Sequence, residues 1–522
     1  MSAPRITRRS VFGIAFGSAV AATAATIGPS FLPQRTGRVL ESQIELPAPF
    51  QVPLPMPEPI RPSSASRGTN HYTLVQRSAA LEILPGVRTN VWGYDGIFPG
   101  PLFDVRARHP ITVEVTNELP VPTSTHLHGG MTPPGSDGYP TDLVLPTDGG
   151  FTPHISGHKG MNLSASDWTF HDGTKIYEYP LNQSAATLWY HDHRMDFTGP
   201  QVWRGLAGMF LVRDEEDDAL PLPKGSKDIA LMICDRSFTA EGQFAYPALD
   251  HRLEEIPGVQ ERFMEGVEGD VNLVNGAPWP EHEVADTRYR LRLLNAANAR
   301  RYGLRLDPPP PDGPSFVQVG SDLGLLAEPV EHEEIVLAPA ERCDTVVNFS
   351  SYPMGTEVRL VNALERGASR EVMRFRVTRR ETDESAIPEV LGEVPSLTRT
   401  DAATTRHFDF QLNQDEMWTI NDQAFDPTNS LADPELGSVE LWRFTSDFHH
   451  PVHLHAAHFQ VLSRSGDTPD PQDVGWKDTV DVRPMETVEV LVRFDGYRGR
   501  YLIHCHNLEH EDMAMMANFT VT

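Results

Sequence analysis

The sequence predicts an all-β protein built from three β-sandwich units. Gly and Pro are abundant, at 39 and 45 of 522 residues, and long helical patterns are scarce, which favours many short strands joined by turns. A turn motif followed by a strand of alternating apolar and polar residues occurs three times, within 94–115, 274–293 and 420–443. Such alternation buries one face of a strand and exposes the other. Three copies, spaced by roughly 150 to 180 residues, predict three sandwiches.

The N-terminus is predicted to be a targeting signal. Thr7–Phe12 reads TRRSVF, a twin-arginine pattern, and an apolar Gly/Ala-rich run follows it to about Ile27. Because that run is marginally short for a membrane span, residues 1–28 are interpreted as a cleaved signal peptide. The mature protein is then expected in the periplasm, outside the cell or at its surface, with no stable membrane span. A Pro-rich linker, residues 29–65, is expected to be extended and to lie on the surface.

The three units are assigned to residues 66–218, 219–385 and 386–522. Units one and three carry histidine-rich segments at equivalent places, one after the first alternating strand and one near the end of the unit. Unit two has Asn298–Gly303 and Val358–Asn362 in these places, without histidine. Unit two is therefore expected to be a spacer that helps to set the docking of the other two, whose histidines would meet at their interface.

Charge and cysteine content narrow the function classes. The formal net charge is −28, which argues against nucleic acid or an anionic membrane as a partner. Three cysteines do not make a disulfide framework. If Cys505 is a metal ligand, Cys234 and Cys343 remain, and they either pair with each other or are two buried thiols.

The segment His504–His510, HCHNLEH, carries the strongest chemical signal. Two histidines, one cysteine and a weak axial methionine are typical of a mononuclear electron-transfer copper site. Cys505, His510 and Met515 provide three of these ligands, so the second imidazole must come from elsewhere. His504 and His506 flank the cysteine in a strand-like alternation and point to the other face. They could serve a second metal centre.

Four His-x-His pairs support that second centre, because residues i and i+2 of a strand share a face. The pairs are His126/His128, His191/His193, His453/His455 and His504/His506. Zinc is the competing metal, but structural zinc sites are closed and often use several cysteines. One thiolate among many imidazoles fits copper better.

These motifs resemble those of the three-domain multicopper oxidases, in the branch of bacterial spore-coat laccases, bilirubin oxidases and aminophenol oxidases. The resemblance extends from about His71 to Thr522. It is most specific in the four histidine segments, in Gly475–Thr479 and in Leu508–Asp512. It implies three cupredoxin-like Greek-key β-sandwich domains and four copper ions.

The resemblance also implies a role for each ligand residue. The type 1 copper would bind His450, Cys505, His510 and axial Met515; the type 2 copper His126 and His453; one type 3 copper His128, His191 and His506, and the other His193, His455 and His504. The spacing His-x-x-His-x-His selects His450 rather than its neighbour His449. Every ligand position of the family is filled.

The implied function is a laccase-like oxidation of phenols, aminophenols or related aromatics, coupled to the reduction of O₂ to two waters. The donor is expected to dock at the edge where His510 emerges. Glu511 and Asp137 match acidic residues implicated in proton delivery, which an acid near a metal site can perform. From the residues alone, a solvated surface acid and a turn residue remain the alternatives for Glu511 and Asp137.

Competing functions are a cuprous-ion oxidase in copper tolerance, a scaffold that uses the fold for protein binding, and a copper nitrite reductase. No Met-rich insertion is found, which favours an organic reductant, and the paired histidines argue against the nitrite reductase. The long segment between His128 and His191 includes His154, His158 and His171. It is interpreted as surface decoration or a pocket wall rather than a fifth metal site. The physiological donor and the oligomeric state are left open.

Overall fold

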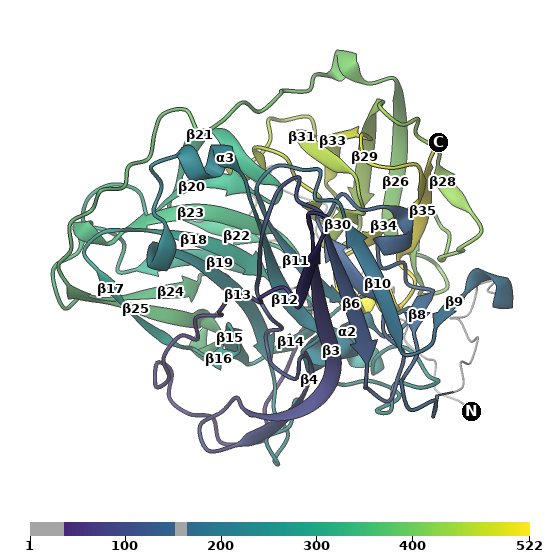
Figure 1. The fold of residues 1–522 in the computed structure, drawn as a ribbon, viewed down its shortest axis with the longest axis horizontal. Helices are drawn as coiled ribbons and strands as arrows, with labels where there is room; N and C mark the ends of the chain where they lie inside the picture. The colour runs from purple at the N-terminus through teal and green to yellow at the C-terminus, as the bar shows by residue number, and fades with distance from the viewer. Residues whose placement is uncertain (1–35, 152–163) are drawn as a thin grey trace, which may run out of the picture. The chain divides into compact units, whose positions relative to one another are not determined.

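Sheet formation follows the predicted three-unit organisation. The computed structural model describes residues 36–151 and 164–522. Within these ranges, six sheets pair into three sandwiches, and each sheet draws its strands from one predicted unit, except that β2 begins at Ser64. The unit boundaries themselves, 66, 219 and 386, stay predictions. Figure 1 shows the strands in chain order from purple to yellow.

Unit one packs a five-stranded sheet on a four-stranded sheet. The strands of the first are β2 (Ser64–Ser66), β3 (Thr69–Glu82), β4 (Arg88–Tyr94), β6 (Ile111–Asn117) and β10 (Thr174–Tyr179); those of the second are β5 (Phe103–Arg106), β7 (Thr125–His128), β11 (Ala186–Asp192) and β12 (Ala207–Arg213). In β6 the predicted alternation is confirmed, since every second side chain from Ile111 is buried. Ile111, Val113 and Val115 share one hydrophobic core with Leu188 and Phe210 from the facing sheet.

Unit two has a seven-stranded and a five-stranded sheet. The first contains β13 (Asp228–Arg236), β15 (Val271–Val274), β16 (Ala277–Pro278), β18 (Arg288–Asn295), β20 (Phe316–Ser321), β21 (Gly324–His332) and β23 (Arg342–Asn348); the second β17 (Glu281–Ala285), β19 (Tyr302–Asp307), β22 (Ile335–Leu337), β24 (Glu357–Asn362) and β25 (Glu371–Arg379). The expected exposed face of β18 is wrong: Arg290 and Arg292 are buried and paired with Asp217 of unit one. Its polar face packs against another unit instead of water.

Unit three has two five-stranded sheets. One contains β26 (Thr404–Leu412), β27 (Trp418–Ile420), β29 (Val439–Ser446), β31 (His458–Arg464) and β33 (Thr487–Arg493); the other β28 (Ser430–Ala432), β30 (His450–Leu454), β32 (Thr479–Val482), β34 (Gly499–Cys505) and β35 (Met516–Val521). Cys505 and Met515 lie in the hydrophobic core of this unit. The Cys505 sulfur is therefore held in an apolar surrounding.

The remaining elements are short. They are the strand pairs β1 (Arg38–Leu40)/β14 (Val267–Gly269) and β8 (Asp142–Val144)/β9 (Thr169–His171), the helices α2 (Thr198–Arg204), α3 (Glu215–Ala219) and α4 (Leu508–Asp512), and the 3₁₀ turns η2 (Pro134–Ser136), η3 (Ala165–Asp167), η4 (Gly225–Lys227), η5 (Glu261–Phe263), η6 (Phe349–Ser351), η7 (Gly367–Arg370), η8 (Arg399–Asp401) and η9 (Pro471–Asp473). Among the described residues, no helix has the length and apolar character needed to cross a membrane.

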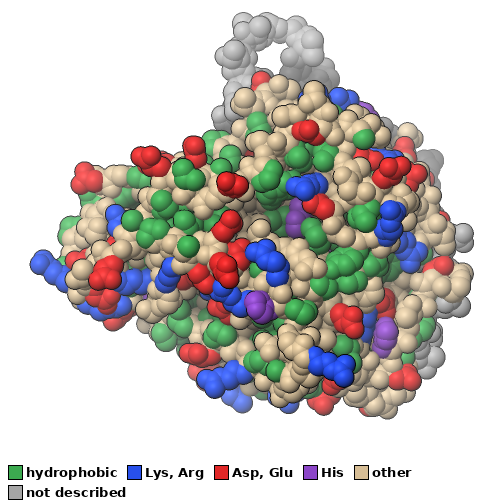
Figure 2. Space-filling view, turned by 45° about the horizontal axis from the view of Figure 1, so that its top comes forward, with side chains coloured by type: hydrophobic (Ala, Val, Ile, Leu, Met, Phe, Trp, Pro, Cys, Tyr) green, Lys and Arg blue, Asp and Glu red, His purple; other side chains and the backbone are tan. Residues whose placement is uncertain are grey.

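Acidic and basic side chains are mixed over the face shown in Figure 2. The negative net charge is thus spread among basic groups on this face rather than gathered in one patch. This distribution is consistent with a role for the acidity in solubility.

Candidate metal centre

Four short strand segments bring eight histidines into one buried cluster between units one and three. In unit one, β7 and β11 pair antiparallel with His126 opposite His191. In unit three, β30 and β34 pair with His453 opposite His504. The i and i+2 partners then project to the same side. All eight side chains are at most 1% exposed; they are His126, His128, His191, His193, His453, His455, His504 and His506.

The two halves of the cluster contact each other ring to ring. His126 stacks on His455 with ring centroids 3.8 Å apart, and His128 stacks on His453 at 3.6 Å. Nε2 of His453 lies 3.5 Å from Nε2 of His126. The predicted interface cluster is therefore present in the geometry, and each half supplies four imidazoles.

Most rings have one nitrogen held by the protein and the other turned toward its neighbours. Nδ1 of His126 contacts the Asp137 carbonyl oxygen at 2.5 Å, Nδ1 of His453 the Asp478 carbonyl at 2.9 Å, and Nδ1 of His191 the Asp192 carbonyl at 2.8 Å. A neutral imidazole that donates from Nδ1 leaves Nε2 as a lone-pair donor for a metal. These rings therefore present Nε2 to the shared space.

His128 is reversed. Its Nε2 contacts Asp478 Oδ1 at 3.0 Å, which leaves Nδ1 for the shared space. Within the described residues, this Nδ1, Nε2 of His191 and His193, and both ring nitrogens of His506 are buried without a hydrogen-bond partner. Buried polar atoms are normally paired, so several orphaned imidazole nitrogens in one place fit metal ions held between them.

The nitrogens fall into groups small enough to share an ion. Donor atoms of His193, His455 and His504 lie within 4.8 Å of one another, as do those of His126, His128 and His191, and those of His126, His453 and His455. His506 joins through its ring, 5.0 Å from that of His128 and 5.2 Å from that of His191. All eight predicted cluster ligands are thus brought together.

Burial keeps these imidazoles neutral and able to bind a metal. Burial lowers the pKa of His191 and of His193 to about 3 and moves the pKa of His126, His504 and His506 well below the ordinary value. Neighbouring imidazoles act in the same direction on each of these rings. These five rings therefore offer lone pairs, not positive charges, at neutral pH.

A second donor set lies around Cys505. Its Sγ is 3.3 Å from Nδ1 of His450 and 3.6 Å from Nδ1 of His510, and the two nitrogens are 3.1 Å apart. Three donors bound in a plane to a first-row metal at roughly 2.1 Å lie about 3.6 Å from one another. The triangle has that size, so it fits one ion.

The structure also shows where the other residues considered for this donor set, Met515 and His449, lie. Met515 is fully buried in the same core, and its carbonyl accepts the N–H of Cys505 at 3.1 Å. His449 turns away from the triangle, with Nδ1 3.4 Å from Asp481. The choice of His450 over His449 is therefore consistent with the geometry.

The two predicted proton carriers are buried beside the histidine cluster. Oδ2 of Asp137 lies 2.8 Å from Nδ1 of His455, and burial raises the pKa of Asp137 to about 8. Glu511, 1% exposed, faces Nδ1 of His193 at 3.4 Å and Nδ1 of His504 at 3.3 Å, and burial raises its pKa too. The alternative of a solvated surface acid is wrong for Glu511, and Asp137 does more than end the turn η2.

Sequence reasoning missed the group that holds His128. Asp478 binds this ring and forms a bidentate ion pair with Arg342, which comes from β23 of unit two. Although burial opposes it, Arg342 lowers the pKa of Asp478 well below its ordinary value. Asp478 lies in the segment on which the family resemblance rests, but Arg342 carries no recognisable signal. Unit two therefore not only separates units one and three but also contacts the cluster, through the ion pair of Arg342 with Asp478.

The edge of His510 does not emerge at the surface, contrary to expectation. The side chain is fully buried, and its Nε2 lies 3.2 Å from the carbonyl oxygen of Glu265. The indole of Trp418 stacks on the imidazole at 3.9 Å, and its N–H donates to the Met264 carbonyl at 3.2 Å. We call Met264–Gly266 together with Trp418 the cover.

The linker prediction is wrong in one part. Residues 38–40 form β1 and pair in parallel with β14, and Thr36 is only 1% exposed. The chain from Thr36 to Leu40 is therefore anchored rather than laid loosely on the surface. The signal segment, residues 1–28, lies outside the described residues.

The other predicted residues lie apart from the metal donors. Cys234 and Cys343 are buried free thiols. His171 lies 2.7 Å from Asp142 and is part of no group of metal donors among the described residues. His154 and His158 lie outside them.

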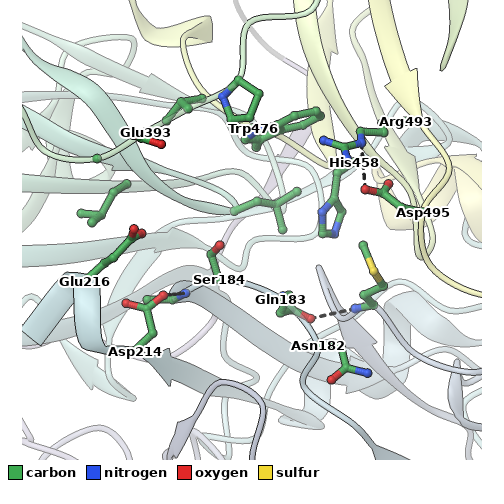
Figure 3. Close-up of a pocket in the computed structure, with 17 residues that line it drawn as sticks. Asn182, Gln183, Ser184, Asp214, Glu216, Glu393, His458, Trp476, Arg493 and Asp495 are labelled. Atoms are coloured by element: carbon green, nitrogen blue, oxygen red, sulfur yellow. Dashed lines mark hydrogen bonds and ion pairs between the residues drawn. The ribbon is translucent and has the colours of Figure 1, made fainter. Parts of the chain in front are cut away.

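A cavity of about 300 Å³ opens at the junction of the units, with His458 pointing into it beside Trp476 (Figure 3). Arg493 and Asp495 form an ion pair at its rim. Among the described residues, none of the twelve predicted copper ligands lines this cavity. It is therefore separate from both donor sets.

Comparisons with known proteins identify the family. Profiles of the family described as "Multicopper oxidase" match residues 398–522 and 76–217, together just over half of the chain. A laccase of Bacillus subtilis (strain 168) is 32% identical over 530 residues, covering 90% of this chain and 98% of that one. A bilirubin oxidase of Albifimbria verrucaria is 34% identical over 508 residues, covering 91% and 81%.

The fold is shared with solved structures. A laccase from Pediococcus acidilactici superimposes with a TM-score of 0.78 at 29% identity, covering 93% of this chain and 95% of that one. The three sandwiches are thus cupredoxin-like. With both donor sets formed and these relatives matched along most of its length, the chain belongs to the multicopper oxidase family of copper-dependent oxidoreductases that use O₂.

Proposed function

We propose that the chain is a laccase-like oxidase that takes electrons singly from phenolic or aminophenolic donors and uses four of them to reduce O₂ to two waters. One observation carries this proposal. Cys505 of the thiolate triangle is bonded in the chain to His504 and His506, whose rings belong to the histidine cluster. The site of one-electron entry and the site able to hold several metals are therefore joined by three residues.

We further propose four copper ions per chain, held as the family resemblance implies. His450, Cys505 and His510, with Met515 axial, would hold the type 1 ion. The cluster would hold the type 2 ion on His126 and His453, one type 3 ion on His128, His191 and His506, and the other on His193, His455 and His504. Bound copper would supply reversible one-electron redox chemistry.

The protein's own groups set where electrons and protons can move. Burial raises the pKa of Cys505 well above its ordinary value, and the backbone N–H of Asn507, which donates to the sulfur at 3.4 Å, partly offsets this rise. Asp137 and Glu511 are proposed to carry protons, because each lies against cluster imidazoles and each has a pKa raised by burial. A carboxyl group with a raised pKa binds a proton more readily and can pass it on where oxygen is reduced.

Trp189 shields the cluster from one side. Its ring lies 4.2 Å from that of His191, 5.2 Å from that of His128 and 5.4 Å from that of His506, and the indole is 1% exposed. It keeps bulk water from these rings and fixes their orientation.

Oxygen uptake by the copper-loaded chain tests the proposal. With 2,6-dimethoxyphenol or an aminophenol, we expect O₂ consumption and an intense visible band from the thiolate bound to copper. Turnover with Cu(I) under the same conditions measures the competing cuprous oxidase, and faster turnover with Cu(I) would favour it. A colourless protein after full copper loading would contradict the proposal.

We also propose export by the twin-arginine route, supported by Thr7–Phe12. A folded metalloprotein suits that route. Replacing Arg8 and Arg9 by Lys should retain the protein in the cytoplasm, as read by cell fractionation, and unchanged export would contradict this assignment.

A further inference from the structure

The cover over His510 is a built element rather than a loop that happens to lie there. The carbonyl oxygen of Glu265 contacts two side chains of the segment His504–His510. His510 Nε2 lies at 3.2 Å, and the amide of Asn507 donates from 3.0 Å. That same amide also reaches the carbonyl of Thr36 at 3.3 Å. The Asn507 side chain thus links the cover to Thr36–Leu40, which we call the N-terminal arm, and to the segment that contains Cys505.

Gly266 shows how closely these parts pack. Its φ of +137° is in the region that side chains rarely adopt. A Cβ there would lie 2.5 Å from the Thr36 carbonyl oxygen, 2.6 Å from Ala299 and 3.0 Å from the Asn507 amide nitrogen. The following residue, Val267, donates its N–H to Glu509 of α4 at 3.0 Å. The cover therefore has little room to move away while the arm is in place.

Trp418 closes the remaining side of His510. Its ring stacks on the imidazole at an interplanar angle of 28°, and its N–H holds the Met264 carbonyl. Phe448 lies 6.1 Å from Trp418 and 5.9 Å from His510 and is partly buried. Aromatic rings therefore stand between the imidazole and the solvent, and the indole itself is 4% exposed.

We propose that donors are oxidised on the outer face of this cover, and that Trp418 sets how closely a donor ring can approach His510. The proposal rests on the proposed function, because it takes His510 as a ligand of the type 1 site. Each phenol loses one electron and one proton and becomes a phenoxyl radical. The electron would cross the cover toward the thiolate site, where copper held by His450, Cys505 and His510 would supply the one-electron acceptor, and the proton leaves to water.

This arrangement has a consequence for specificity. A donor held outside a closed cover makes few directional contacts, so its rate depends on its potential more than on its shape. We expect the wild-type enzyme to accept donors of varied size.

The test compares Trp418→Ala with Trp418→Phe in the copper-loaded full-length chain. The control is Trp476→Ala, which removes an indole from the separate cavity of Figure 3. The readouts are the thiolate band, the type 1 reduction potential, and the anaerobic bleaching of that band by 2,6-dimethoxyphenol and by hexacyanoferrate(II). Hexacyanoferrate(II) serves as a bulky hydrated donor that cannot enter a slot the size of an indole.

In Trp418→Ala, we expect bleaching by the phenol to become saturable and about tenfold faster at low concentration, because an opened pocket adds contacts. Bleaching by hexacyanoferrate(II) should not become faster, because this donor cannot enter the opened space and a lower reduction potential reduces its driving force. The reduction potential should fall, since water reaches the ligand. Trp418→Phe keeps an aromatic ring over His510 but loses the N–H bond to the Met264 carbonyl, so its phenol rate should lie between those of wild type and Trp418→Ala. Trp476→Ala should leave bleaching by both donors as in wild type. A phenol rate in Trp418→Ala equal to or below that of wild type would overturn the proposal.

A measurement on the apoprotein keeps the idea testable if Trp418→Ala folds poorly. Diethyl pyrocarbonate modifies accessible neutral imidazoles, and mass spectrometry locates them. His510 should be protected in the wild-type apoprotein while exposed His251 reacts. Equal modification of the two would overturn the closed cover. Copper-loaded wild-type protein without a thiolate band would instead contradict the proposed function. Failure of the cover proposal and failure of the proposed function are therefore distinguishable.

Discussion

Loss of Asp478 should lower both the stability of the fold and the affinity for copper. Asp478 joins all three units: it is in unit three, it binds Arg342 of unit two, and it holds His128 of unit one. Arg342 is fully buried. In Asp478→Asn the guanidinium loses its main counter-charge, and breaking a buried pair in this way costs about 3–5 kcal/mol.

The loss of stability in Asp478→Asn should lie at the lower end of that range. Arg342 keeps three carbonyl acceptors, those of Thr187, Ala340 and Asp322, at 2.9 to 3.1 Å. We therefore expect the free energy of unfolding of the apoprotein to fall by about 3 kcal/mol. Copper affinity should fall by roughly 10–100-fold, because the variant no longer fixes the charge behind the His128 ring.

The assay combines urea unfolding of the apoprotein with copper retained against a graded chelator. The matched control is Asp473→Asn, which breaks the buried pair with Arg464 elsewhere in unit three. Both variants should lose stability, but only Asp478→Asn should lose copper. Equal copper retention in the two variants would refute the reasoning that Asp478 acts through His128.

Three further predictions concern Glu511, bound copper and Glu489. Glu511→Gln should slow O₂ reduction by about 10²–10⁴-fold, the usual contribution of a proton-transfer group, without changing anaerobic bleaching by a donor. The control is Glu509→Gln on the same helix α4, whose side chain faces Tyr246 and which should not slow O₂ reduction. Equal slowing in the two variants would contradict the proton relay. Removing copper with a chelator should lower the melting temperature, since a bound ligand stabilises the native state; an unchanged value would mean that copper does not bind here. Hydrogen bonding from Arg399 lowers the pKa of Glu489 to about 2 against burial, so its stabilisation is present above its unfolded pKa and is lost as pH falls toward 2; an unchanged acid unfolding midpoint in Glu489→Gln would contradict this.

The repeat pattern made the strands and the histidine cluster predictable from sequence. His-x-His on a strand fixes two rings on one face, and its recurrence in two of three units predicts that they meet. The pairing of His126 with His191, and of His453 with His504, is the structural form of that pattern. Cys505 and its spacing to His510 predicted two members of the thiolate triangle, and the third, His450, came from the resemblance to the family.

Contacts between distant, chemically ordinary residues could not be predicted. Glu265 acts through its carbonyl oxygen, which no side-chain pattern reports, and it lies 245 residues before His510. Arg342 resembles any strand arginine until Asp478 is placed against it. Thr36 lies in the Pro-rich linker that was predicted to lie on the surface, yet it is buried and its hydroxyl donates to the carbonyl of Ala299. Packing between units decides such contacts, and single-sequence periodicity carries no information about it.

Copper content per chain tests the central claim most directly. Metal analysis of the loaded wild-type protein and of Cys505→Ser, with the visible band as a second readout, separates the two donor sets. We expect four copper ions in the wild type, and three in Cys505→Ser with the thiolate band gone and the histidine cluster still loaded. A single copper in the wild type, or a cluster that empties when Cys505 is replaced, would contradict the assignment of two independent sites joined by His504–His506.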